Sequence, residues 1–286
     1  MSLRKSKCNQ SALDLCVIKH PAQLLKKEVN VIKQYCIDER YSLWSLSSLY
    51  HQIKRDGAAY FSISTYYKYV GLLKLNRCKA KHRRKNHVVG IRATKPLQIL
   101  HADVTVLRLL DTTKAYIYFI QDNFSRMILS YKVALKCSAE FVKENLKEVN
   151  EQYIMPNNST DCQLITDDGS ENHSVTNEYC SNNFIEHLIA QKDIVQSNSM
   201  IEAANKQIKY RFLYHQTIAT FDELENYVQP AVDDYNNRPY SALNGLTPVE
   251  VMNGKLPANV NYYEQTKQAT QHRIIENKKA TCCNFI

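Results

Sequence analysis

Several features that would place the protein in other classes are missing from its 286 residues. No uninterrupted apolar run reaches the roughly 18–20 residues that a membrane-spanning helix needs, and the first residues lack the apolar core and cleavage site of a secretory signal. The nine cysteines include no Cys-x-x-Cys pair, which favours reduced thiols with packing roles over disulfides or a structural zinc site. With 44% hydrophobic and 23% charged residues, the chain is expected to be a soluble, cytoplasmic globular protein with no membrane partner.

Acidic residues are absent from positions 57 to 102, where ten lysines and arginines lie. The whole chain has 37 basic and 28 acidic residues, and outside this segment 27 basic residues remain, so the segment supplies the entire positive excess. Its densest part contains Arg77, Lys79, Lys81, Arg83, Arg84 and Lys85. Such a run is commonly a solvated linker, and nuclear targeting is a competing interpretation. A cationic linker is also suited to following a nucleic-acid backbone, and we predict that Arg83, Arg84 and Lys85 contact DNA.

Residues 21 to 75 show three helical patterns. The first can open at Pro21, the second runs from Leu43 to Asp56-Gly57, and the third begins at Ser62 or Ser64 and meets Gly71. This arrangement predicts a small all-α domain of the helix-turn-helix type, although plain three-helix packing fits the pattern equally well. Within the third helix, the candidates for DNA contact are Lys68 and Tyr66.

The pattern changes from about Pro96 onward to alternating strands and helices. Three strands at 99–107, 115–121 and 127–133 have short links that are typical of an antiparallel meander. The chain then alternates between helices at 138–153, 177–190, 199–213 and 221–235 and short strands at 163–166 and 194–196. We therefore expect an α/β fold with a mixed sheet and helices on its faces.

Three acidic residues lie where these predicted elements can bring them together. Asp103 is in the first strand, Asp167 follows the strand at 163–166, and Glu202 lies on the helix that begins near 199. Clustered carboxylates repel one another unless a divalent cation neutralises them. The pattern therefore predicts a metal site for phosphoryl transfer on nucleic acid, although the sequence does not exclude Asp168 in place of Asp167.

One face of the helix around Glu202 combines acid and base. At about 100° per residue, Glu202, Lys206 and Lys209 fall on one stripe, which could offer a carboxylate to metal and two ammonium groups to phosphate. Taken alone, the stripe is more often a solvated face with ion pairs between successive turns. The apolar residues Ile201, Ala204, Ile208 and Phe212 form a neighbouring stripe that can pack on a sheet.

Five ordered blocks carry a resemblance to a known family. They are RATKPLQILHADVT at 92–105, YIYFIQDNFSRMILSY at 116–131, LITDDGSE at 164–171, SMIEAANKQIKYRFL at 199–213 and YNNRPYSALNGLTPVEVMNG at 235–254. In these blocks the chain resembles transposases and integrases of the DDE (retroviral integrase-like) superfamily, in particular those of bacterial insertion sequences. The resemblance implies a ribonuclease H-like mixed five-stranded sheet with flanking helices, which would follow the helical domain.

The resemblance also implies residue roles. It makes Asp103, Asp167 and Glu202 the catalytic acids, holding two Mg²⁺ or Mn²⁺ ions, and Lys209 a residue that contacts DNA. It further implies a protein that binds element ends and target DNA as a homo-oligomer, in the nucleoid of a bacterial cell. Cleavage would free a 3′-hydroxyl, which would then join to target DNA, so no covalent protein intermediate is expected.

Two stretches depart from the family pattern. Many relatives have a Gly-Pro-Asp-Asn-Ala-like loop before the acidic helix, where this chain has QSNSM at 196–200, so the geometry of DNA-end approach is in doubt. Relatives often have Asn where this chain has Asp168. Retroviral integrases also carry a His-His-Cys-Cys zinc module, but no paired cysteines follow His82 and His87 here, and we predict no structural zinc.

These interpretations divide the chain into four parts: a helical DNA-binding domain at 1–76, a basic linker at 77–95, a catalytic core at 96–255 and a loosely ordered tail at 256–286. Two other functions stay open. One is a metal-dependent nuclease or resolvase on the same fold, which would cut DNA without joining it. The other is a transposase derivative that binds DNA but has lost its activity.

Overall fold

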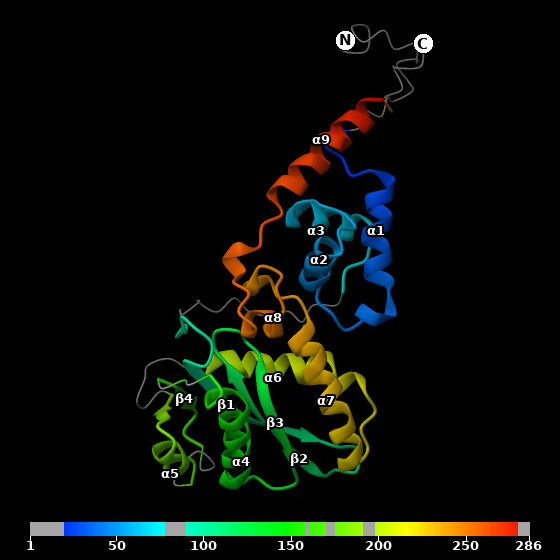
Figure 1. Cartoon of the computed structure of the whole chain (residues 1–286). Coiled ribbons are helices and arrows are strands. Elements are labelled where there is room, and N and C mark those ends of the chain that lie inside the picture. The colour runs from blue at the N-terminus through cyan, green and yellow to red at the C-terminus, as the bar shows by residue number, and fades with distance from the viewer. Residues whose placement is uncertain are drawn as a thin grey trace. The chain divides into compact units, whose positions relative to one another are not determined.

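The computed structural model describes residues 20–77, 90–157, 159, 161–169, 175–190 and 198–279 (Figure 1). It divides into a helical unit, made from positions 1–80 and 258–286, and a core unit at 81–257. Within the described residues, no helix is long and apolar enough to cross a membrane.

The helical unit contains the three predicted N-terminal helices. They are α1 (Lys26–Ile37), α2 (Leu46–Arg55) and α3 (Ile63–Leu72). Ser45 and Ser62 cap α2 and α3 by accepting hydrogen bonds from backbone N–H groups in the first turn. Gly57 follows α2 with a φ of 67°, a conformation that glycine adopts without strain. Seven residues, 56–62, separate α2 from α3, which is longer than the usual helix-turn-helix turn of about 3–4 residues.

The predicted loosely ordered tail is wrong for residues 263–279. These residues form the helix α9 (Tyr263–Lys279), which belongs to the helical unit. The Arg273 guanidinium donates to both carboxylate oxygens of Glu28 on α1 (3.0 and 2.9 Å), and both side chains are buried. Asn277 donates to the carbonyls of Pro21 and Gln23. The helix is held by polar contacts with distant parts of the chain and has no apolar stripe. A sequence pattern therefore could not predict it.

The core unit is built on a five-stranded mixed sheet with the strand order β3-β2-β1-β4-β5. Its strands are β1 (Ile99–Arg108), β2 (Lys114–Asp122), β3 (Ile128–Ala134), β4 (Gln163–Thr166) and β5 (Glu186–Ile189). The first three are antiparallel, and β4 and β5 continue parallel to β1. The predicted mixed sheet and ribonuclease H-like fold are thereby confirmed.

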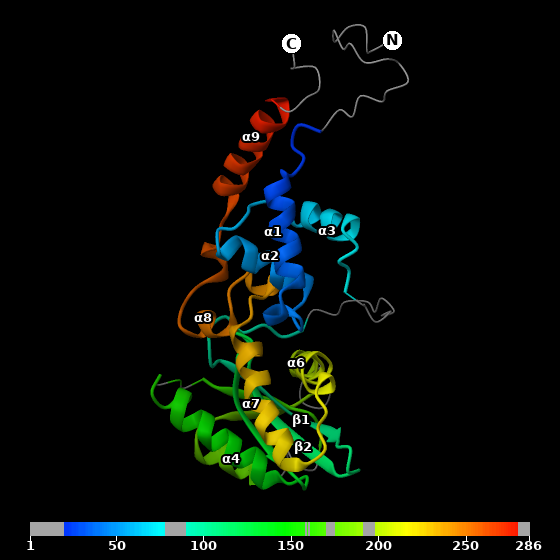
Figure 2. The ribbon, with the colours of Figure 1, turned by 90° about the vertical axis from the view of Figure 1, so that its right-hand side faces the viewer.

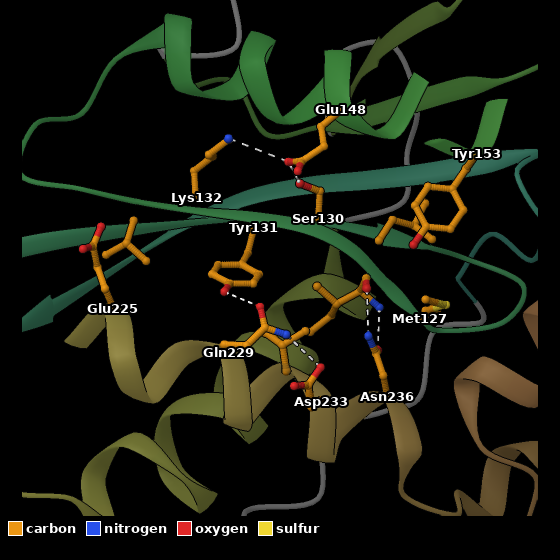
Figure 3. A pocket seen from close by; sticks show the side chains of 14 residues that line it. Met127, Ser130, Tyr131, Lys132, Glu148, Tyr153, Glu225, Gln229, Asp233 and Asn236 are labelled. Carbon is orange, nitrogen blue, oxygen red and sulfur yellow. Dashed lines mark hydrogen bonds and ion pairs between the residues drawn. The ribbon is translucent and has the colours of Figure 1, made fainter. Parts of the chain in front are cut away.

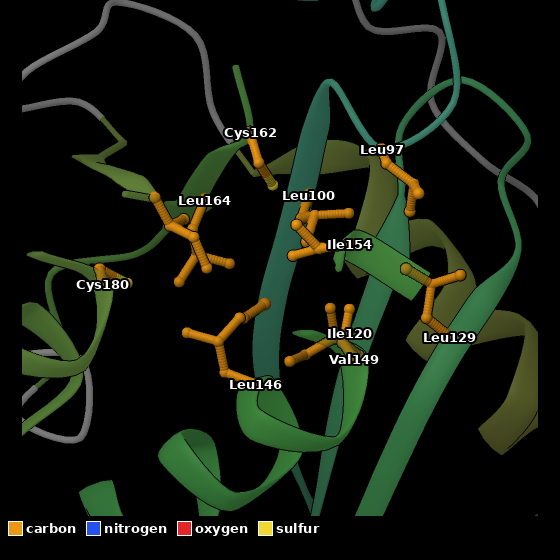
Figure 4. Packing of buried hydrophobic residues seen from close by; sticks show 12 residues of the cluster. Leu97, Leu100, Ile120, Leu129, Leu146, Val149, Ile154, Cys162, Leu164 and Cys180 are labelled. Carbon is orange, nitrogen blue, oxygen red and sulfur yellow. The ribbon is translucent and has the colours of Figure 1, made fainter. Parts of the chain in front are cut away.

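Helices cover both faces of this sheet (Figures 1 and 2). They are α4 (Ala139–Val149), which continues into a π-helical turn at Asn150–Ile154, α5 (Val175–Asn182), α6 (Ser199–Arg211) and α7 (Phe221–Asn237). The short helix α8 (Pro248–Met252) contacts α7. Leu100 and Ile120 pack with Leu146 and Val149 of α4 (Figure 4). Ala102 belongs to the same buried cluster. The residues between them in β1 point to the opposite face, where α6 lies, because successive side chains in a strand alternate.

One predicted helix is partly wrong. Residues 177–190 were expected to be helical, but α5 ends at Asn182 and β5 begins at Glu186. Phe184 has a φ of 57° in the turn between them, and β5 then pairs in parallel with β4. Pairing with a neighbouring strand decides the conformation of such a short segment, and the local pattern did not show it. The strand predicted at 194–196 lies outside the described residues.

Candidate active site

The face of β1 that points toward α6 carries the candidate site. Its alternate residues His101, Asp103 and Thr105 each form a hydrogen bond with α6 or with the residue that starts it. The three pairs are His101 Nδ1 with Asn198 Oδ1 (2.6 Å), Asn205 Nδ2 with Asp103 Oδ2 (2.6 Å) and Lys209 Nζ with Thr105 Oγ1 (3.1 Å). Hydrogen bonds at the start, the middle and the end of α6 therefore fix this helix to β1, the strand that bears Asp103.

The surroundings of Asp103 disfavour its ionised form. Burial, followed by the negative charge of Asp167, raises the pKa of Asp103 to about 7, and the charge of Glu202 contributes in the same direction. The hydrogen bond from Asn205 favours the ionised form and limits the rise. Such a carboxylate gains from any cation that binds beside it.

The strand register favours Asp167 over Asp168 as the partner of Asp103. His101 on β1 lies level with Ile165 on β4. Continuing this parallel register by two residues places Asp167 level with Asp103 and on the same face, while Asp168 would belong to the opposite face. The Asp167 carboxylate accepts a hydrogen bond from the N–H of Gly169 (3.3 Å).

Glu202 lies in the first turn of α6 and is exposed. One of its oxygens is 3.9 Å from Nζ of Lys206, an ion pair between successive helical turns. Its charge acts on Asp103, but no group of three His, Cys, Asp or Glu side chains within the described ranges lies close enough to hold a metal ion. The structure thus places the three acids around one region without closing them into a ligand set.

The two predicted basic residues of α6 differ in their surroundings. Lys206 is exposed and pairs with Glu202. Lys209 is half-buried, and its ammonium group also donates to the Val106 carbonyl (2.7 Å). In this structure the Lys209 charge therefore stabilises the contact between α6 and β1.

The prediction that Tyr66 contacts DNA is wrong, because its side chain is buried. Tyr66 is fully buried, stacks on Phe61 and contacts the Cys36 thiol through its hydroxyl (3.6 Å). It belongs to the core of the helical unit because it shares the inner face of α3 with Val70, four residues later. Its neighbours Tyr67 and Lys68 are exposed. Arg83, Arg84 and Lys85 lie outside the described residues.

The sequence did not predict three polar residues of this site, which are Asn205, His101 and Asn198. Asn205 is almost completely buried, and its Oδ1 has no hydrogen-bond partner. His101 and Asn198 are also buried, and burial lowers the pKa of His101 to about 4, so its ring is neutral at physiological pH. Asn205 could have been noticed because it lies one helical turn after Glu202, whereas His101 and Asn198 are far apart in the sequence and carry no local signal.

A cavity among the described residues lies elsewhere, at the β3 edge of the sheet. It has a volume of about 500 Å³ and is lined by β3, α4 and α7 (Figure 3). Tyr131 donates to Gln229 across it, and Asn236 bonds both backbone groups of Ile128. None of the three acids lines this cavity. The candidate site and this cavity are therefore separate.

One family model matches part of the core unit. The family model of the integrase core domain matches residues 185–248, a segment that includes Glu202 and α6. No curated protein is similar enough to count as a relative.

Three solved structures show similarity at low sequence identity. A structure of the simian T-cell lymphotropic virus intasome in complex with PP2A regulatory subunit B56 gamma contains a chain that is 15% identical, with 79% of this chain and 75% of that chain covered and a TM-score of 0.48. The HTLV-2 integrase catalytic core domain in complex with magnesium is 20% identical, covering 56% and 99%, with a TM-score of 0.41. The catalytic core domain of BIV integrase is 18% identical, covering 60% and 99%, with a TM-score of 0.43.

The matched segment contains Glu202, whereas Asp103 on β1 and Asp167 directly after β4 lie outside it. The segment at 185–248 is thus similar to integrase core domains, and it belongs to a unit built on a five-stranded mixed sheet.

Proposed function

We propose that the protein is a DDE-type transposase or integrase that cleaves the 3′ ends of a mobile DNA element and joins them to target DNA. The observation that carries this proposal is the repulsion of the half-buried Asp103 by two further acids, Asp167 and Glu202, in a unit with a segment similar to integrase core domains. A repulsive carboxylate cluster costs stability, and a divalent cation would offset that cost.

The residues present suit Mg²⁺ or Mn²⁺. Asp103, Asp167 and Glu202 offer only carboxylate oxygens, which these hard cations prefer. The unpaired Oδ1 of Asn205, next to Asp103, adds another oxygen that can accept a hydrogen bond from a water or hydroxyl in the site. When bound, the metal would activate the attacking oxygen and stabilise the leaving oxygen.

The reaction would have two steps. Water attacks the phosphodiester at the element's end, the bond to the 3′-oxygen breaks, and a 3′-hydroxyl is freed. That hydroxyl then attacks a phosphodiester of the target, displaces its 3′-oxygen and joins the two DNAs. The chain's own part is to orient the groups: Asn205 holds one oxygen of Asp103, and Lys209 fixes α6 against β1.

DNA would be held by basic residues around this site and in the helical unit. Lys68 and Lys206 are exposed, which leaves their ammonium groups accessible to phosphates. Arg83, Arg84, Lys85 and Lys209 complete the proposed DNA-binding set. Joining two element ends requires at least two protomers, so we propose a homo-oligomer on DNA, in a bacterial nucleoid.

A cleavage and joining assay tests the proposal. Purified protein is incubated with labelled DNA from the flanks of its own gene, with Mg²⁺ or Mn²⁺, and Asp103→Asn, Asp167→Asn and the matched control Asp168→Asn are compared with the wild type. We expect nicked and joined products with the wild type and Asp168→Asn, and none with the other two variants. Full activity of Asp103→Asn would refute the metal assignment.

The same assay separates the two rival functions. Metal-dependent nicks without joined products would indicate a nuclease or resolvase. DNA binding without either product would indicate a transposase derivative that has lost activity.

A further inference from the structure

A chain of buried hydrogen bonds fixes the start of α6 to β1. Asn198 stands at the N-cap position, where an asparagine side chain commonly bonds to its own helix. Here it forms no such bond. Its Oδ1 contacts His101 Nδ1 (2.6 Å), and its Nδ2 donates to the carbonyl of Ala102 (2.8 Å). Both polar atoms of the side chain are therefore committed to the strand that bears Asp103.

The other ring nitrogen of His101 continues the chain. Asn123 Nδ2 lies 2.8 Å from His101 Nε2, and Asn123 Oδ1 accepts the N–H of Ala93 (2.8 Å). The Asn123 amide also donates to the carbonyl of Ile91 (3.2 Å). Three side chains from three distant parts of the core unit thus form one connected network.

Backbone groups at both ends of this network determine its direction. A backbone N–H only donates and a carbonyl only accepts, so Ala93 and Ala102 fix the orientation of the two asparagine amides. His101 must then donate from Nδ1 to Asn198 and accept at Nε2 from Asn123. The neutral His101 tautomer with its proton on Nδ1 satisfies all hydrogen bonds of the network. In a protonated ring, the N–H at Nε2 would face the N–H donor of Asn123.

We propose that His101 is a positioning residue of the active site, which acts through Asn198 to fix where the helix carrying Glu202 begins relative to Asp103. This inference rests on the proposed function for its catalytic consequence. Its structural basis is independent of that function. Asn198 also supplies the first backbone acceptor of α6, because the N–H of Glu202 donates to its carbonyl (3.3 Å). A loosened Asn198 would therefore loosen the turn that holds Glu202.

Amide hydrogen exchange tests the positioning directly, without DNA or metal. We expect the amides of residues 202–204 to exchange at least about tenfold faster in His101→Leu and Asn198→Ala, since each change leaves buried amide groups without partners. His101→Gln keeps one donor and one acceptor and should restore exchange to within about threefold of the wild type. His215→Leu, the same replacement at an exposed histidine, is the control and should leave exchange unchanged.

The double variant His101→Leu/Asn198→Ala distinguishes action through Asn198 from separate effects. If His101 acts through Asn198, the double variant should exchange no faster than the more affected single variant. The inference would be overturned if the double variant's increase in exchange rate equalled the product of the two single increases. Exchange within about twofold of the wild type in both single variants would also overturn it. Because each side of the contact has its own variant, the test survives a failure of His101→Leu to fold.

End cleavage provides the catalytic readout. We expect kcat to fall about 10–100-fold in His101→Leu while KM for DNA stays within about twofold, and His101→Gln to recover most of the loss. An unchanged kcat alongside faster exchange would overturn the catalytic role. If the wild type shows no metal-dependent cleavage, the proposed function fails, and exchange alone decides whether His101 fixes the start of α6.

Discussion

Replacing Asp103 by asparagine should stabilise the folded protein at neutral and alkaline pH while abolishing the proposed activity. The pKa of Asp103 rises from its ordinary 3.8 to about 7, through burial first and then the Asp167 charge. Between these two values the folded protein keeps a proton that the unfolded chain has released, so stability falls as the pH rises. Asparagine has nearly the same shape and carries no charge, so the variant escapes this loss.

The size of the effect follows from the same values. Between pH 5 and pH 7, the extra proton of the folded protein should lower the free energy of unfolding by about 2.7 kcal/mol. Partial exposure of the carboxylate to water reduces this change to about 2 kcal/mol. The advantage of Asp103→Asn should grow by this amount between pH 5 and pH 8 and level off above pH 7. For a domain of this size, we expect the difference in Tm to grow by about 4–8 °C.

Thermal unfolding of both proteins at pH 5, 6, 7 and 8 measures this difference. Adding Mg²⁺ at pH 8 should raise the Tm of the wild type and not that of the variant, because a ligand stabilises only the protein that binds it. A Tm difference that stays constant with pH, or a variant that is less stable than the wild type at pH 8, would refute the reasoning.

Three further predictions follow from other contacts. Lys209→Met should lower the free energy of unfolding by about 1 kcal/mol in urea, because it removes the bonds to β1; unchanged stability with weaker DNA binding would show that Lys209 leaves the strand to contact DNA. Arg273→Met should destabilise the helical unit by about 3–5 kcal/mol in thermal unfolding, since Glu28 is left buried and unpaired, and adding Glu28→Gln should recover most of the loss. Lys68→Ala should make the log–log salt slope of DNA binding less negative by about 0.9, whereas Tyr66→Phe should not change it, and equal slopes for Lys68→Ala and the wild type would remove Lys68 from the interface.

Local patterns in the sequence were sufficient for the elements of the sheet that carry the first two acids. Alternation of apolar residues predicted β1, and the apolar run before Asp167 predicted β4; both strands are present. The helix from 199 was also predicted, and its apolar stripe is buried at Ile201, Ala204 and Ile208. In each case one face of the element is buried, so the period of the pattern was informative.

Contacts between distant residues were not predictable in this way. The bond of Asn205 to Asp103 joins residues 102 positions apart, and that of His101 to Asn198 spans 97. Nothing local distinguishes a buried asparagine that will find a partner from an exposed one. The assignment of Tyr66 to DNA was a different error, because its spacing with Val70 already indicated the inner face of α3.

The helix α9 makes the order of synthesis important for the helical unit. Glu28 is translated 245 residues before Arg273, its buried partner. At about 5–20 residues per second, roughly 12–50 s separate the two on the ribosome. During that interval α1 carries a carboxylate without its counter-ion. The segment with α1 therefore leaves the ribosome well before it can reach its final structure, and a chain interrupted before α9 would leave α1 without this buried contact.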